Sequence, residues 1–282
     1  MFVFVAAPLA HAVETTPRES ITLSPVKERY ALDAGTAKAD ELTVVNDGET
    51  SYDFIMYARP YSVHNETYND PDFTAQTPTT DVYKWVQFPQ TKYHLEAGKT
   101  VKIPYTIRVP QNAAPGGHYG VLFAETQPTD TSGGNSVVRK KRVGMIIYAT
   151  INGQFQMGGQ SLGTSIPFMQ FHSPLSATSR IKNTGNSDFV VSSMYRITDL
   201  FGGEKYRVDK DYAVLPQTTR LMTFTWDKSP WFGLFKVQVK TSFLDQKNDT
   251  TKLVLMVPRW LLVVAALTLA GGVIYALLRR RR

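Results

Sequence analysis

Apolar and polar side chains alternate along several short stretches of this chain. In residues 100–109 every second residue is apolar, and the residues between them are polar or proline. A period of two places the apolar side chains on one face, so the pattern predicts a half-buried β-strand. Pro104 falls on the polar side, which predicts a sheet edge or a bulge. Residues 222–226 and 235–243 alternate in the same way.

Further apolar stretches predict strands over residues 41–46, 52–61, 120–126, 143–151, 189–197 and 252–257. Gly-, Asn- and Pro-containing turns separate them at short intervals, and no amphipathic helix is recognisable among them. Many short strands with such punctuation are typical of all-β sandwiches.

The two halves of the chain carry similar turns in the same order. Asn46-Asp47-Gly48 and a turn at residues 95–100 in the first half correspond to Asn183-Thr184-Gly185 and a turn at 215–219 in the second. We therefore expect two tandem immunoglobulin-like β-sandwiches, over residues 13–152 and 160–257, joined near residues 156–159.

An apolar segment follows the last predicted strand. It runs from Leu261 to Leu278 without a charge, and as a helix these 18 residues would be about 27 Å long. Trp260 and Tyr275 lie near its ends, as interfacial aromatic residues do. A buried core helix would show a polar stripe, which this segment lacks. We predict one transmembrane helix over residues 260–278.

Charged residues around this segment set its expected orientation. Arg279, Arg280, Arg281 and Arg282 follow it directly, and the positive-inside rule predicts that this tail (279–282) is cytoplasmic and that the preceding domains are extracellular. Subtracting these four arginines and Arg259 from the formal charge of +7 leaves +2. The net charge therefore gives no reason to expect nucleic-acid binding.

The first residues are consistent with export. Residues 2–9 are apolar, and Ala10-His11-Ala12 fits a cleavage site, so we predict a signal peptide over residues 1–12 whose true start lies further upstream; a first strand is the alternative. The chain contains 43% hydrophobic residues and no cysteine. This composition excludes a disordered chain, a disulfide scaffold, a thiol nucleophile and cysteine-ligated metals.

The histidines of the sequence suggest no catalytic metal site, since no HExxH pair occurs. Asp70 and Asp72 are close enough to bind Ca²⁺ or to act as an acid–base pair, but we favour a solvated turn, because the stretch is rich in turn residues. We expect no enzyme activity, metal or cofactor.

Aromatic residues and one glycine-rich segment are the candidates for ligand binding. Flat rings bind sugars well, which favours Tyr61 and Trp85, although both fit a core equally. His118 and Tyr119 lie in Pro115-Gly116-Gly117-His118-Tyr119-Gly120, where they would contact a ligand or serve a turn. Trp231-Phe232 follows Pro230 at an expected loop tip, where it would contact lipid, a partner or the core.

Several segments of the sequence are distinctive: the Ser24-Pro25-Val26-Lys27 start, the Asn46 turn, the Trp85 region, the 95–100 turn and above all the Val109-Pro110 and Ala114–Gly120 segments. Together they resemble the WxL-interacting protein family. The resemblance covers roughly residues 19–257 and the anchor. It implies a bacterial cell-surface protein with a peptidoglycan-binding first domain, an immunoglobulin-like second domain linked to host-protein binding, and a membrane helix with a basic tail.

These observations together predict a single-pass surface protein that attaches to peptidoglycan, another wall polymer or wall-associated proteins, for adhesion or scaffolding without catalysis. Surface or host proteins are further expected partners. The alternative is a membrane-tethered assembly chaperone or secretion-complex subunit that presents an edge strand to protein clients.

Overall fold

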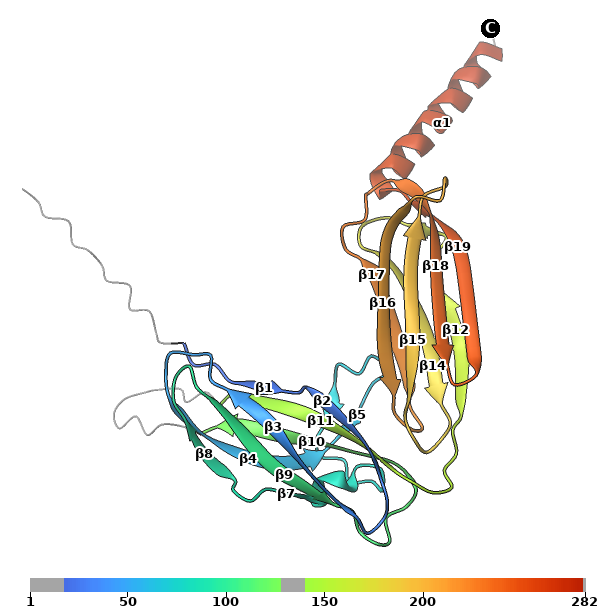
Figure 1. Ribbon diagram of the computed structural model, residues 1–282. Helices are drawn as coiled ribbons and strands as arrows, with labels where there is room; N and C mark the ends of the chain where they lie inside the picture. Colours follow the sequence, from blue (N-terminus) through green and yellow to red (C-terminus); the bar gives the residue numbers. More distant parts are fainter. Residues whose placement is uncertain (1–17, 128–139, 281–282) are drawn as a thin grey trace, which may run out of the picture. The chain divides into compact units, whose positions relative to one another are not determined.

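The computed structural model describes residues 18–127 and 140–280 (Figure 1). The predicted signal peptide, Arg281 and Arg282 lie outside this range. The chain divides into two compact units, which we call the first unit and the second unit. The first unit holds residues up to 61, 76–113 and 119–149, and the second holds 62–75, 114–118 and the residues from 150 onward. The segments 62–75 and 114–118 thus cluster with the second unit, not with the first domain as predicted.

Two sheets form the sandwich of the first unit. The four-stranded sheet has the order β1 (Thr22–Ser24), β3 (Ala37–Val45), β9 (Thr100–Arg108), β7 (Val86–Gln87). The five-stranded sheet has the order β2 (Lys27–Leu32), β11 (Arg142–Ile151), β10 (Gly116–Thr126), β4 (Tyr52–Pro60), β8 (Lys92–Leu95).

The second unit repeats this arrangement. Its three-stranded sheet has the order β12 (Gly159–Ser165), β14 (Leu175–Asn183), β17 (Thr219–Trp226). Its five-stranded sheet has the order β13 (Met169–Gln170), β19 (Gln246–Met256), β18 (Gly233–Phe243), β15 (Phe189–Thr198), β16 (Glu204–Val214). Except for β7 in the first unit and β5 and β6 in the second, each strand of one unit has a counterpart in the same place in the other. The prediction of two immunoglobulin-like sandwiches is confirmed.

The predicted alternation positions the core. Along β18, Phe235, Val237 and Val239 are buried, whereas Lys236 and Lys240 are exposed. The buried faces of both sheets of the second unit meet in one hydrophobic cluster. Each large side chain buried in this way contributes roughly 1.5–3 kcal/mol.

Local details bear on the predicted strands. β7 pairs only with Thr106 and Ile107 of β9. Pro104 therefore lies in a part of β9 that has no neighbouring strand on that side, which suits a residue without a backbone N–H. A 3₁₀ helix, η1 (Asp81–Lys84), precedes Trp85. A two-residue ladder joins β5 (Ser62–Val63) to β6 (Pro71–Asp72) in the second unit.

One helix completes the described chain. α1 (Arg259–Arg280) begins two residues after β19 ends, and none of its side chains is buried. Its 22 residues extend about 33 Å, and its mean hydropathy is 2.5 over the most apolar window. It is the one helix in the described residues that is long and apolar enough to cross a membrane. The predicted anchor residues Trp260, Leu261, Leu278, Arg279 and Arg280 all lie within it.

Candidate functional site

The four residues predicted to contact a ligand are buried. The exposed fractions are 6% for Tyr61, 5% for Trp85, 3% for His118 and 1% for Tyr119. The rings of Tyr61 and Tyr119 both pack edge-on against Tyr148. Rings buried to this extent have no free face on which a sugar could stack. This burial corrects our expectation: the four residues do not form an open binding surface.

The glycine-rich segment has a structural reason for its sequence. Gly116 has a φ of +123°, a conformation that side chains rarely adopt. A Cβ on Gly120 would meet Cγ1 of Val82 at 2.6 Å. His118 forms a hydrogen bond through Nε2 with the carbonyl oxygen of Ala114, at 2.8 Å. The turn that Pro115 was expected to initiate therefore depends on these glycines.

The first unit offers no exposed aromatic face in its described residues. The only large apolar side chain there that is mostly exposed is Val26. A glycan-binding surface of the kind we expected requires several flat rings open to solvent. The described residues of the first unit thus form no patch of mostly exposed rings, and the half-buried Tyr93 lines an open hollow of about 420 Å³ with Asp53 and His94.

A segment of 14 residues, 62–75, covers part of the second unit. The Tyr68 hydroxyl accepts a hydrogen bond from the backbone N–H of Leu215 at 2.9 Å and is also bonded to the Thr218 hydroxyl. The Arg220 guanidinium lies 4.3 Å from the centre of the Tyr68 ring. Tyr68 therefore fixes this segment on the turn between β16 and β17.

Glu66 makes the second attachment of the segment. Its carboxylate accepts two hydrogen bonds from Arg180 on β14, at 2.8 and 2.6 Å, which lowers the pKa of Glu66. Its backbone oxygen accepts a hydrogen bond from the N–H of Leu221 at 2.7 Å. The segment thereby occupies part of the free edge of β17.

The acidic pair in this segment forms a turn. Oδ1 of Asp72 accepts hydrogen bonds from the hydroxyl and the backbone N–H of Thr74, both at 2.7 Å, and these bonds lower the pKa of Asp72. The Asp72 side chain thus has a local structural role. Across residues 18–127 and 140–280, no group of three or more His, Asp or Glu side chains lies close enough to hold a metal ion.

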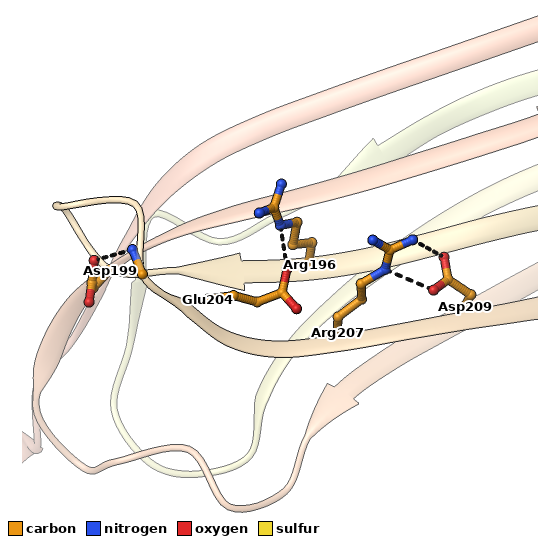
Figure 2. Close-up of polar contacts among 6 residues, drawn as sticks. Arg196, Asp199, Glu204, Arg207 and Asp209 are labelled. Atoms are coloured by element: carbon orange, nitrogen blue, oxygen red, sulfur yellow. Dashed lines mark hydrogen bonds and ion pairs between the residues drawn. The ribbon is translucent and has the colours of Figure 1, made fainter.

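The remaining long edges of the second unit resist strand pairing. β12 has a register shift between Ser161 and Gly163. β16 is an 11-residue edge strand with alternating charges, and Figure 2 shows the ion pairs Arg196–Glu204 at 2.7 Å and Arg207–Asp209 at 2.8 Å. Bulges and charged side chains are common protections of sheet edges. An edge that accepts a client strand, as the assembly-chaperone hypothesis requires, would lack them.

The outer face of the five-stranded sheet is the strongest candidate for a binding surface. The register aligns one row across four strands, Asp209, Met194, Lys240 and Asp249. A second row contains Asp211, Ser192, Ser242 and Lys247. These rows line an open hollow of about 580 Å³, which we call the charged face.

Polar contacts organise the charged face. Lys240 pairs with Asp249 at 3.2 Å, and the Gln238 amide donates to both oxygens of the same carboxylate. The hydrogen bonds from Gln238 and, to a smaller extent, the one from Lys240 lower the pKa of Asp249. The face thus presents fixed charges of both signs around Met194. The alternation in β18 predicted that Lys240 points outward, but no sequence pattern aligned it with Asp209 and Asp249.

Comparison with known proteins finds similarity only in three dimensions. Neither a protein-family model nor any curated protein matches the sequence. Among solved structures, the chain is similar to the Escherichia coli chaperone DraB, with 12% identity, a TM-score of 0.39, and coverage of 86% of this chain and 97% of that one.

Two further structures show similar values. The structure of the Salmonella enterica SafA pilin with the SafB chaperone gives 12% identity and a TM-score of 0.41, covering 84% and 98% of the two chains. The Pseudomonas aeruginosa CupB2 chaperone gives 9% identity and a TM-score of 0.40, covering 83% and 100%. At such values the similarity does not extend to partners or activity.

Proposed function

We propose that this chain is a non-catalytic, membrane-anchored module that binds other proteins outside the membrane. In this proposal α1 crosses the bilayer, its terminal arginines stay in the cytoplasm, and both sandwiches are extracellular. The partner docks on the charged face. The observation that carries the proposal is the hollowed, charge-patterned sheet face on the unit that continues directly into a membrane-length helix.

The chemistry of this face favours a protein over a neutral glycan. Asp209, Lys240 and Asp249 provide fixed charges of both signs, which complement the mixed charges of a protein surface. Met194 supplies a flexible apolar contact between them. No aromatic ring lines the hollow, whereas sugar sites depend on such rings.

Within the second unit, face docking also fits the protected edges better than strand addition does. In the first unit β9 has a free side beyond the two-residue β7, and the assembly-chaperone hypothesis stays the alternative there. An assembly chaperone that offers an edge strand needs unpaired backbone groups along a flat edge. β16 carries ion pairs, β12 carries a bulge, and Glu66 bonds to the edge of β17. Protein binding is common to both hypotheses, and the docking position distinguishes them.

Attachment to peptidoglycan is a second proposal, which rests on the resemblance to the WxL-interacting family. The observation in its favour is the segment 114–120, the most specific part of that resemblance.

The test uses the full chain in its native membrane, with a photo-crosslinking amino acid at Met194. The matched control places it at Thr223, which is exposed on the other sheet of the same unit. We expect a discrete protein adduct from position 194 and none from position 223. The paired exchange Lys240→Asp with Asp249→Lys keeps an ion pair but reverses its direction, so it should abolish the adduct without unfolding the unit.

Other outcomes contradict the proposal. An adduct that survives the charge exchange, or equal adducts from both positions, would exclude the charged face as the docking site. Retention of the purified full chain on insoluble peptidoglycan, with no protein adduct from position 194, would favour wall attachment instead.

A further inference from the structure

Three loops and the start of α1 meet at one end of the second unit. The strand registers show that these elements meet. Met256 at the end of β19 pairs with Gly233 at the start of β18. Thr198 at the end of β15 pairs with Lys236, near the same start of β18. The short strand β13 pairs with the same end of β19. The loops 166–174, 199–203 and 227–232 therefore lie at the end from which α1 begins (Figure 1).

Each of these loops exposes an aromatic side chain. Phe201 is 99% exposed, Phe168 77%, Trp231 61% and Phe232 53%. Trp231 lies against Trp260 of α1, with 6.2 Å between ring centres. The guanidinium of Arg259 lies 5.4 Å from the centre of the Phe171 ring. We call Phe168, Phe201, Trp231 and Phe232 the aromatic tip.

The loop that carries Phe201 is built to hold it outward. The Asp199 carboxylate accepts hydrogen bonds from the backbone N–H groups of Phe201 and Gly203, at 2.9 and 2.8 Å. Lys205 pairs with the same carboxylate at 3.0 Å. Gly202 has a φ of +86°, which completes a tight turn. A rigid turn that places a phenyl ring in solvent does not serve the core.

The short connection between β19 and α1 determines which surface this end of the second unit faces when α1 spans a membrane. Only Val257 and Pro258 separate β19 from α1, and two residues span at most about 7 Å. The aromatic tip therefore lies at the level of the lipid headgroups. Tryptophan favours that layer because its apolar ring leaves water while its N–H stays hydrated, and exposed phenylalanine rings gain by burial at the boundary between headgroups and acyl chains.

We propose that the aromatic tip inserts into the interfacial layer of a phospholipid bilayer and seats the second unit on the membrane surface. This contact is additional to the crossing by α1. It rests on the membrane anchoring in the proposed function, but not on the charged face or on any protein partner.

The experiment uses the full chain in phosphatidylcholine–phosphatidylglycerol vesicles. Because the chain has no cysteine, Phe201→Cys provides a unique site for a nitroxide label. The matched control is Asp245→Cys, in the turn between β18 and β19 at the opposite end of the 11-residue β18. We expect the label at 201 to be severalfold more accessible to oxygen, relative to a water-soluble nickel complex, than the label at 245.

A second measurement does not depend on the label. In a Trp260→Phe background, brominated lipid should quench tryptophan fluorescence, and the further change Trp231→Phe should remove most of that quenching. Equal accessibility at positions 201 and 245, together with unchanged quenching after Trp231→Phe, would overturn the proposal. If alkaline carbonate extracts the chain from vesicles, the membrane anchoring itself fails, which distinguishes the two failures.

Discussion

Asn46 and Asn183, 137 positions apart in the sequence, make the same three side-chain hydrogen bonds in the two units. Nδ2 of Asn46 donates to the carbonyl oxygens of Thr50 and Leu95, and Oδ1 accepts from the N–H of Gly48. Nδ2 of Asn183 donates to Ser187 and Val214, and Oδ1 accepts from Gly185. Both asparagines are fully buried. Each asparagine thus joins the loop that follows its own strand to the end of another strand by hydrogen bonds.

These buried amides predict a large effect of substitution. Asn183→Ala leaves two carbonyl groups and one N–H without their partner, and each unsatisfied buried group costs about 1–3 kcal/mol. We expect the second unit to lose on the order of 2–4 kcal/mol in urea unfolding of the detergent-solubilised chain. Asn183→Asp should cost at least as much, because a carboxylate would face two carbonyl oxygens. A loss of stability smaller than that of the exposed control Thr223→Ala would contradict the structural role of Asn183.

The same comparison corrects the repeat as read from the sequence. The ranges 95–100 and 215–219 match residue 95 with residue 215, but the contacts match Leu95 with Val214 and Gly98 with Gln217. Gly98 and Gln217 both have positive φ angles, +70° and +56°. The order of the turns was predictable, while the one-residue offset was not, because a non-glycine residue adopts the left-handed conformation in the second turn.

Gly120→Ala should destabilise the first unit. The added methyl group would lie 2.6 Å from Cγ1 of Val82 and 3.2 Å from the backbone oxygen of Arg59. Overpacking of this kind costs about 1–3 kcal/mol. Thermal unfolding of the full chain in detergent measures it, with Gly272→Ala in α1 as a control, since no atom lies within 4 Å of that position. Equal stability of the two variants would refute the tight packing.

Tyr68→Phe should loosen the segment 62–75 without removing its ring from Arg220. The N–H of Leu215 loses its acceptor, and the Thr218 hydroxyl loses one of its two hydrogen bonds. This should cost about 1 kcal/mol, or roughly a fivefold increase in local opening. Limited proteolysis within 62–75 measures the opening. Tyr68→Ala should increase it further, and no change in either variant would contradict the contact.

The attachment through Glu66 should depend on pH. Hydrogen bonds from Arg180 hold the pKa of Glu66 below its ordinary value of 4.5, so the stabilisation is complete above that value and is lost as the pH falls through the lower pKa of the folded state. We expect the exchange protection of the Leu221 amide, corrected for intrinsic rates, to fall below pH 4.5. In Glu66→Gln, the protection should be lower throughout and independent of pH. The effect is small because both side chains are partly solvated.

Much of the fold follows from local patterns, and the rest depends on contacts distant in sequence. β9, β18 and α1 were predictable because unbroken alternation or an uncharged run specifies them. β14 was missed because Ala177 and Ser179 occupy buried positions on it, and β16 because its charged residues obscure the alternation of Tyr206, Val208 and Tyr212. The pairing of Glu66 with Arg180 spans 114 positions, and no local pattern encodes it.

The burial of the predicted site residues was unpredictable for a related reason. Tyr61, Trp85, His118 and Tyr119 have residue types that suit either a core or a sugar site, and burial decides between them. Burial depends on how two sheets pack, which the sequence of one strand does not specify. The charged face instead results from the register of four strands.

The account depends most directly on the side of the membrane that each part of the chain faces. Single cysteines in the cysteine-free chain, Asp245→Cys in the second unit and Arg280→Cys at the end of α1, can be tested with a membrane-impermeant maleimide on intact cells. We predict that position 245 is labelled at once and position 280 only after permeabilisation. Labelling of position 280 but not of position 245 in intact cells would place the sandwiches in the cytoplasm and contradict the account.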